Sequence, residues 1–134
     1  MVHFATFESR LTPFFSLGFD GIDIEWASPI TASQFRTIVT TVKSAIGSAK
    51  VSISTPKDFW SLSGVNAVTT DLKNNVEFAS LITHSTVTTL SSPNSIVNIA
   101  ATLETVQRAG FPPDLVLMGT PFYGRYDRNR IVLS

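Results

Sequence analysis

The stretch FDGIDIEWA, residues 19–27, decides how the rest of the chain is interpreted. Its apolar residues alternate with Asp23 and Glu25, which predicts a β-strand that carries both carboxylates on one face. Residue 27 has the same parity, so its side chain is expected on that face, at the carboxyl end of the strand. That residue is Ala27. The stretch, called the acidic strand below, therefore predicts two carboxylates followed by a methyl group.

A helix is predicted before the acidic strand. Apolar side chains recur at helical spacing over residues 4–15, and Gly18 supplies an end signal. Pro13 lies inside this pattern and is expected to kink or break the helix, because proline removes a backbone donor.

The helix after the acidic strand has the clearest signals in the chain. Thr31 and Gln34 have the spacing of a capping box, in which each side chain binds the other residue's backbone N–H. An apolar face follows over residues 35–46, and Gly47 is the expected stop. The acidic strand thus lies between two helices.

The remaining sequence continues this alternation. Strands are expected at 51–55, 76–83 and 115–120, with helices at 59–72 and from Ser92 to the residue before Gly110. The run 115–120 is almost continuously apolar, which is typical of a strand covered on both faces. Alternating single helices and strands predict parallel strands with crossover helices. The pattern alone leaves a doubly wound sheet and a (β/α)₈ barrel open.

Composition excludes several classes of protein and site. The 134 residues suit one domain, and ten basic residues balance ten acidic ones, so neither nucleic acid nor an anionic membrane is favoured as partner. Cysteine is absent, and the two histidines, His3 and His84, lack metal-site spacing, so no metal or cofactor is expected. No apolar run approaches the ~20 residues of a membrane span, and no signal-peptide pattern is visible.

Two motifs resemble glycoside hydrolase family 18, the chitinase family. The acidic strand resembles the family's Asp-Gly-x-Asp-x-Asp-x-Glu strand, and Trp26 also matches. The family's Pro-Phe-Tyr-Gly-Arg signature stands unaltered at residues 121–125. More weakly, residues 76–85 resemble a strand that ends in Met-x-Tyr-Asp in the family. Residues 54–60 resemble the family's strand between the acidic strand and that third motif.

The resemblance implies an α/β fold over residues 1–134 in the form of an incomplete (β/α)₈ TIM barrel. About four parallel strands, resembling the family's fourth to seventh, are expected with their crossover helices. A complete barrel takes ~250 residues, so the first three strands and the last are expected to lie outside this chain. The open sheet edges that result are expected to make the chain unstable alone or to favour self-association.

The family's mechanism implies roles for the acidic strand. In such enzymes the acetamido oxygen of the substrate attacks the anomeric carbon, while the motif's glutamate protonates the leaving oxygen. Asp23 and Glu25 are motif remnants, and Ala27 stands where the family has that acid. Glu25 lies two residues lower, about 6.6 Å along the strand, whereas acid catalysis needs contact within ~3.2 Å. Glu25 is therefore not expected to replace the acid.

Other residues receive weaker assignments. Tyr123 and Arg125 match the family's substrate-lining strand end. Two alternatives stay equally open for them: they hold the sugar, or they have no role in binding it. The family's Tyr-Asp pair is replaced by His84 and Ser85; His84 either donates a hydrogen bond to a sugar or has no role. Packing is preferred to sugar stacking for three aromatic residues: Trp26, Phe59 and Trp60.

Three functions remain open by resemblance. The chain is a chitinase-type enzyme, a non-catalytic protein that binds chitin or N-acetylglucosamine oligosaccharides, or a non-functional truncated product. The substitution at Ala27 favours a protein without catalytic activity. Relatives are usually extracellular, but the compartment of this chain stays open.

Overall fold

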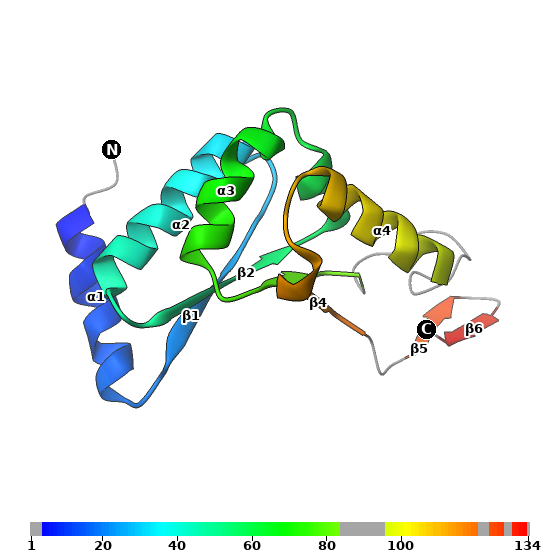
Figure 1. Ribbon diagram of the computed structural model, residues 1–134. Coiled ribbons are helices and arrows are strands. Elements are labelled where there is room, and N and C mark those ends of the chain that lie inside the picture. Colours follow the sequence, from blue (N-terminus) through cyan, green and yellow to red (C-terminus); the bar gives the residue numbers. More distant parts are fainter. Residues whose placement is uncertain (1–3, 84–95, 121–123, 128–129, 134) are drawn as a thin grey trace.

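The main sheet contains four parallel strands in sequential order (Figure 1). The computed structural model describes residues 4–83, 96–120, 124–127 and 130–133. The strands are β1 (Gly21–Glu25), β2 (Lys50–Thr55), β3 (Ala79–Leu81) and β4 (Val116–Met118). A doubly wound sheet reverses its strand order at a switch point, whereas this sheet runs β1-β2-β3-β4. The chain therefore forms part of a (β/α)₈ barrel, as predicted.

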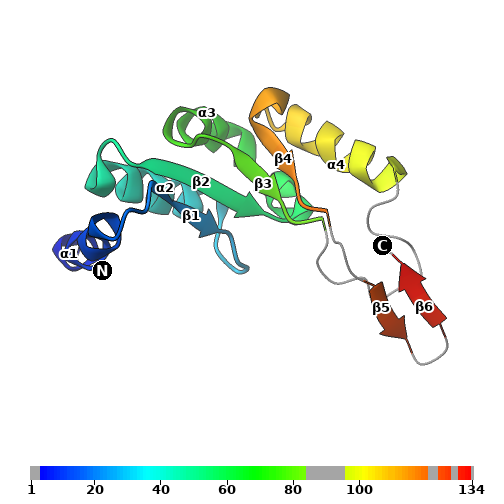
Figure 2. The same cartoon turned by 90° about the horizontal axis from the view of Figure 1, so that it is seen from below.

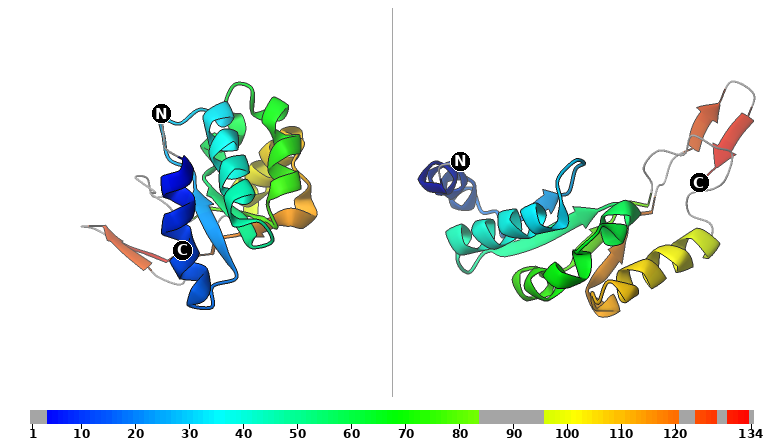
Figure 3. Two further views of the ribbon diagram at one scale, coloured as in Figure 1. Left: turned by 90° about the vertical axis from the view of Figure 1, so that its left-hand side faces the viewer. Right: turned by 90° about the horizontal axis from the view of Figure 1, so that it is seen from above.

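One helix precedes β1, and the other helices connect successive strands and cover one face of the sheet. The helices are α1 (Phe4–Ser16), α2 (Ala32–Ile46), α3 (Val65–Asn75) and α4 (Ile96–Arg108), with short 3₁₀ helices η1 (Lys57–Ser61) and η2 (Pro113–Leu115). The views in Figure 3 show α2, α3 and α4 side by side on the same side of the strands. In the part of the chain that the structure describes, no helix is long and apolar enough to cross a membrane.

Local signals fixed the ends of α2 as predicted. The Thr31 side chain accepts a hydrogen bond from the Gln34 amide at 3.2 Å, and the Gln34 side chain accepts one from the Thr31 amide at 3.0 Å. At the other end Gly47 takes a positive φ of 60° and donates its amide to the Lys43 carbonyl. The capping box and the glycine stop are both confirmed.

Two helix predictions need correction. Of the kink or break expected at Pro13, the break does not occur, since α1 continues through Pro13 to Ser16. The single helix expected at 59–72 is divided into η1 and α3 at Gly64, whose φ is +78°. Its apolar periodicity persisted across the break because both pieces pack on the same core.

The core lies between the sheet and the helices. Val51, Ile53 and Thr55 of β2 alternate toward it, as do Ala79 and Leu81 of β3. Phe59 is fully buried at its centre, with ring centroids of Phe35 and Trp60 at 5.1 and 5.0 Å. These rings supply the apolar area that fixes η1 against the carboxyl end of the sheet.

The opposite face of the sheet is open. Figure 2 shows the helices on one side of the strands and none across the other within the described chain. Leu117, in the middle of β4, is 51% exposed. The prediction that β4 is covered on both faces is therefore wrong for the described residues, because only the helix-facing side of the strand is packed. The strands are also shorter than the runs 76–83 and 115–120 that predicted them.

A small antiparallel hairpin was not predicted. Its strands are β5 (Gly124–Asp127) and β6 (Arg130–Leu133), and they form a separate two-stranded sheet. Gly124 and Arg125 of the Tyr-Gly-Arg signature belong to β5 and not to the main sheet.

Candidate functional site

The acidic strand forms β1, which is an edge of the main sheet among the described strands. Asp23 and Glu25 are exposed on the open face, whereas Ile22 and Ile24 are partly buried against the core. The alternation of the sequence thus becomes an alternation of faces, as predicted. The two carboxylates lie over an uncovered sheet surface on which a ligand can approach.

Asp23 is held by two hydroxyl groups of the neighbouring strand. The Ser52 hydroxyl donates to Oδ1 of Asp23 at 2.5 Å, and the Ser54 hydroxyl donates to Oδ2 at 2.7 Å. The parallel register pairs Asp23 with Ser52, so Ser54 lies one side-chain position further along the same face. Both oxygens of the carboxylate are therefore engaged by β2.

Glu25 has no such restraint. Its side chain makes no hydrogen bond or ion pair with the part of the chain that the structure describes. The register places it in a row across the sheet with Ser54, Ser80 and Leu117. The row begins with the free carboxylate of Glu25 and ends with the exposed apolar side chain of Leu117. The row is therefore amphipathic.

Ala27 follows the last residue of β1 by two positions and is exposed. The intervening Trp26 amide continues the pairing with β2 by donating to the Ser54 carbonyl at 2.9 Å. A methyl group has neither a proton to transfer nor a lone pair to offer. The carboxyl end of β1 consequently carries no acid beyond Glu25.

Trp26 packs inside the molecule, as predicted. Its indole is 8% exposed, lies 5.8 Å from the ring of Phe59 and donates to the Ile30 carbonyl at 2.7 Å. Its polar N–H is therefore satisfied within the loop that leads to α2. Trp26 holds this loop against the core and does not offer a stacking surface on the open face.

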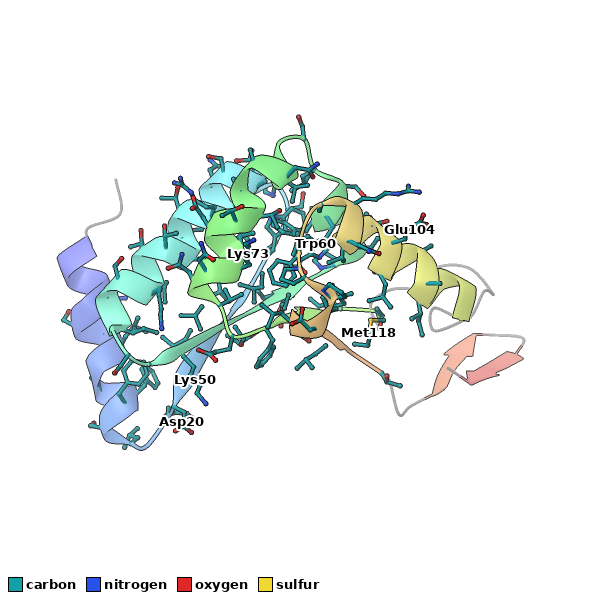
Figure 4. All side chains as sticks on the ribbon, viewed as in Figure 1. Asp20, Lys50, Trp60, Lys73, Glu104 and Met118 are labelled. Carbon is teal, nitrogen blue, oxygen red and sulfur yellow. The ribbon has the colours of Figure 1, made fainter. Side chains whose placement is uncertain are left out.

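Phe59 and Trp60 also belong to the core, which confirms the preference for packing. They are 0% and 2% exposed. The Trp60 indole donates to the Thr55 hydroxyl at 2.9 Å, and Figure 4 shows Trp60 between the helices and the sheet. An aromatic sugar platform built from these two rings is excluded.

Gly21 lies where the acidic strand comes close to the neighbouring strand. A Cβ atom on Gly21 would lie 2.3 Å from the carbonyl oxygen of Lys50, far inside van der Waals contact. The glycine therefore allows the backbones of β1 and β2 to approach closely at the start of their pairing. This approach sets the register that brings Asp23 to Ser52.

Three of the site residues predicted from the sequence cannot be placed relative to the open face of the sheet. His84 and Tyr123 lie outside the described residues, and so does the Arg125 side chain, although its backbone pairs with Val132 in the hairpin. Their roles in sugar binding stay predictions. At the carboxyl ends of β3 and β4, the Thr83 hydroxyl donates to the Gly119 carbonyl, which ties the two strand ends together.

Sequence reasoning missed Ser52 and Ser54. The signal was present in the run VSIST, residues 51–55, where apolar side chains alternate with hydroxyl-bearing ones. What the sequence lacked was the pairing partner, because Asp23 lies 29 residues before Ser52. Only the strand order and register join the three residues.

A cavity of about 560 Å³ lies at the other end of the sheet. Figure 4 shows two of its lining residues, Asp20 and Lys50, at the amino ends of β1 and β2, away from Trp60. Among the described residues, no group of three acidic or histidine side chains could hold a metal ion. The open face remains the candidate site. The cavity is lined by Leu11, Phe15, Phe19, Asp20, Ala45, Ile46, Ser48, Ala49 and Lys50.

Comparison with known families gives one match. The sequence model described as "Glycosyl hydrolases family 18" matches residues 6–130. The match extends over nearly the whole chain, from α1 through β5, and ends at the first residue of β6. Neither the curated proteins nor the solved structures yield a match.

Proposed function

The chain belongs to glycosyl hydrolase family 18, and from this premise we propose that it binds β-1,4-linked N-acetylglucosamine oligosaccharides without hydrolysing them. The fold is that of the chitinase-like glycosidases. Polar groups that can bind a sugar remain on the open face of the sheet, whereas the acid that hydrolysis needs is absent.

The observation that carries the proposal is Ala27. Its position, two residues beyond Glu25 on the acidic strand, corresponds to the acid of the family motif. Loss of a general acid typically lowers a rate by about 10²–10⁴. Because the sugar's own acetamido group acts as nucleophile in this family, no second protein carboxylate compensates for the missing proton donor.

Glu25 does not restore the acid. It lies about 6.6 Å below residue 27 along the strand, and one additional methylene relative to aspartate spans only a fraction of that distance. A general acid must come within about 3.2 Å of the leaving oxygen or use one water. The position of Glu25 therefore suits a ligand contact better than proton transfer to the glycosidic oxygen.

The chemistry of the open face supports sugar binding. Asp23 and Glu25 offer oxygen acceptors, and Leu117 offers an exposed apolar surface in the same row as Glu25. A pyranose ring has hydroxyl and amide donors at its edge and C–H groups on its face, so it matches a surface of this kind. Carboxylate acceptors give the stronger, charge-assisted hydrogen bonds.

Two assays on the purified chain test the proposal. We expect tetra-N-acetylchitotetraose to bind in isothermal titration calorimetry, while cellotetraose, which lacks the acetamido groups, binds more weakly. We expect no release of a fluorophore from a chitobioside conjugate above the background rate. Hydrolysis at the rate of an ordinary glycosidase would contradict the proposal and show that the chain is an enzyme. Absence of any sugar binding would favour the non-functional product.

We further propose that the chain self-associates through the sheet. The outer edges of β1 and β4 have no strand partner within the described residues, and Leu117 exposes apolar surface beside one of them. Unpaired strand edges favour pairing with another chain. Analytical ultracentrifugation across a range of concentrations should detect a dimer; a well-folded monomer at every concentration would contradict this second proposal.

A further inference from the structure

Two serine hydroxyls restrain both oxygens of a single carboxylate on the open face. Ser52 donates to Asp23 Oδ1 at 2.5 Å and Ser54 donates to Oδ2 at 2.7 Å. Both serines come from β2, so the carboxylate is drawn toward that strand and away from the free edge of β1. Rotation of Asp23 about χ1 would break both bonds together.

These bonds also decide the polarity of the surface. A serine hydroxyl has one proton to donate and lone pairs with which to accept. The proton of each serine is used by Asp23, so Ser52 and Ser54 can act only as acceptors toward the open face. Glu25, which makes no bond to the described chain, adds a further acceptor.

We propose that Ser52 and Ser54 are positioning residues: they fix Asp23 in one orientation and make the β1–β2 surface a uniform array of acceptors. Such a surface selects hydroxyl and amide N–H donors of a sugar and disfavours ligands that present only acceptors. The ligand part of this inference rests on the proposed sugar binding. The fixed orientation of Asp23 does not, since it follows from the two hydrogen bonds alone.

The orientation is tested first, without any ligand. Three-bond couplings between Hα and the two Hβ protons of Asp23 report its χ1 rotamers in solution. We expect one rotamer in the unsubstituted chain and averaged couplings in the double variant Ser52→Ala/Ser54→Ala. The variant Ser52→Thr/Ser54→Thr keeps both hydroxyls on residues that favour strands, so it should retain one rotamer.

A matched control removes two hydroxyls elsewhere. Ser33 and Ser44 lie on α2, and the Ser44 hydroxyl donates to the Thr40 carbonyl within that helix. The double variant Ser33→Ala/Ser44→Ala should leave the Asp23 couplings unchanged. A single Asp23 rotamer in Ser52→Ala/Ser54→Ala, equal to that of the control, would overturn the positioning role.

Sugar binding is then compared in the same four proteins. Loss of charge-assisted hydrogen bonds should weaken binding of tetra-N-acetylchitotetraose about tenfold in Ser52→Ala/Ser54→Ala. The threonine and α2 variants should stay close to the unsubstituted chain. If the sugar binds and all four affinities agree, the acceptor surface plays no part in recognition and that half of the inference fails. If the unsubstituted chain binds no sugar, the proposed function fails, and the rotamer result still decides the positioning role.

Discussion

The indole N–H of Trp60 donates a hydrogen bond to the hydroxyl of Thr55 at 2.9 Å, and both side chains are buried. Thr55 is the last residue of β2, and Trp60 lies in the 3₁₀ helix that follows. The bond satisfies a polar group that would otherwise be buried without a partner. It also fixes the direction of the chain as it leaves the sheet.

Thr55→Val should therefore destabilise the protein. Valine has nearly the shape of threonine but leaves the Trp60 N–H without an acceptor, at a cost of about 1–3 kcal/mol. Urea denaturation followed by tryptophan fluorescence measures the change in the free energy of unfolding. Thr70→Val, at an exposed position of α3, is the matched control and should change it by about 0.5 kcal/mol or less. Equal effects of the two variants would contradict the importance of the buried bond.

Gly21→Ala should disturb the pairing of β1 with β2. The new Cβ would lie 2.3 Å from the Lys50 carbonyl oxygen, which forces the two backbones apart at a cost of about 1–3 kcal/mol. Hydrogen exchange of the Lys50 amide, which donates to the Asp20 carbonyl at 3.0 Å, should become faster.

Gly64→Ala is the control for that variant. Its Cβ would meet no atom within 4 Å, so its cost is confined to the left-handed backbone conformation, about 1–2 kcal/mol. It should leave local exchange at Lys50 unchanged. Slow exchange of the Lys50 amide in Gly21→Ala would show that the strands tolerate the side chain.

Phe59→Ala should be among the most destabilising single substitutions. The ring is fully buried and contacts the rings of Trp26, Phe35 and Trp60. Loss of a buried phenylalanine ring costs about 3–5 kcal/mol. Phe14→Ala removes a ring that is 53% exposed and should cost under about 1 kcal/mol in the same urea titration. Comparable midpoints for the two variants would refute the placement of Phe59 at the centre of the core.

Glu25→Gln should weaken sugar binding while leaving the fold intact. The amide keeps the size of the side chain but replaces a charged acceptor, so the affinity for tetra-N-acetylchitotetraose should fall about tenfold. Because Glu25 makes no bond to the described chain, the unfolding midpoint should not move. Glu77→Gln, at an exposed position before β3, is the control for the change in net charge and should bind normally. Unchanged affinity in Glu25→Gln would remove Glu25 from the binding surface.

The helices and strands were predictable where short-range signals act. The capping box at Thr31 and Gln34 and the stop at Gly47 involve residues close in sequence, and the structure contains them as predicted. The break at Gly64 was not foreseen, and Pro13 does not break α1, because the effect of such a residue depends on whether the rest of a turn or a shared core maintains the helix. The hairpin after β4 had no recognised turn signal and was missed.

The sequence by itself determined the alternation of helices and strands, the face on which Asp23 and Glu25 lie, and the methyl group of Ala27 in place of an acid. These properties follow from side-chain periodicity along a single strand and from the identity of one residue. Only the tertiary structure decided that Ser52 and Ser54 hold Asp23 and that Leu117 is exposed. The physical reason is that each of these depends on strand order and register, which bring together side chains from distant parts of the chain and leave one face of the sheet without a covering layer.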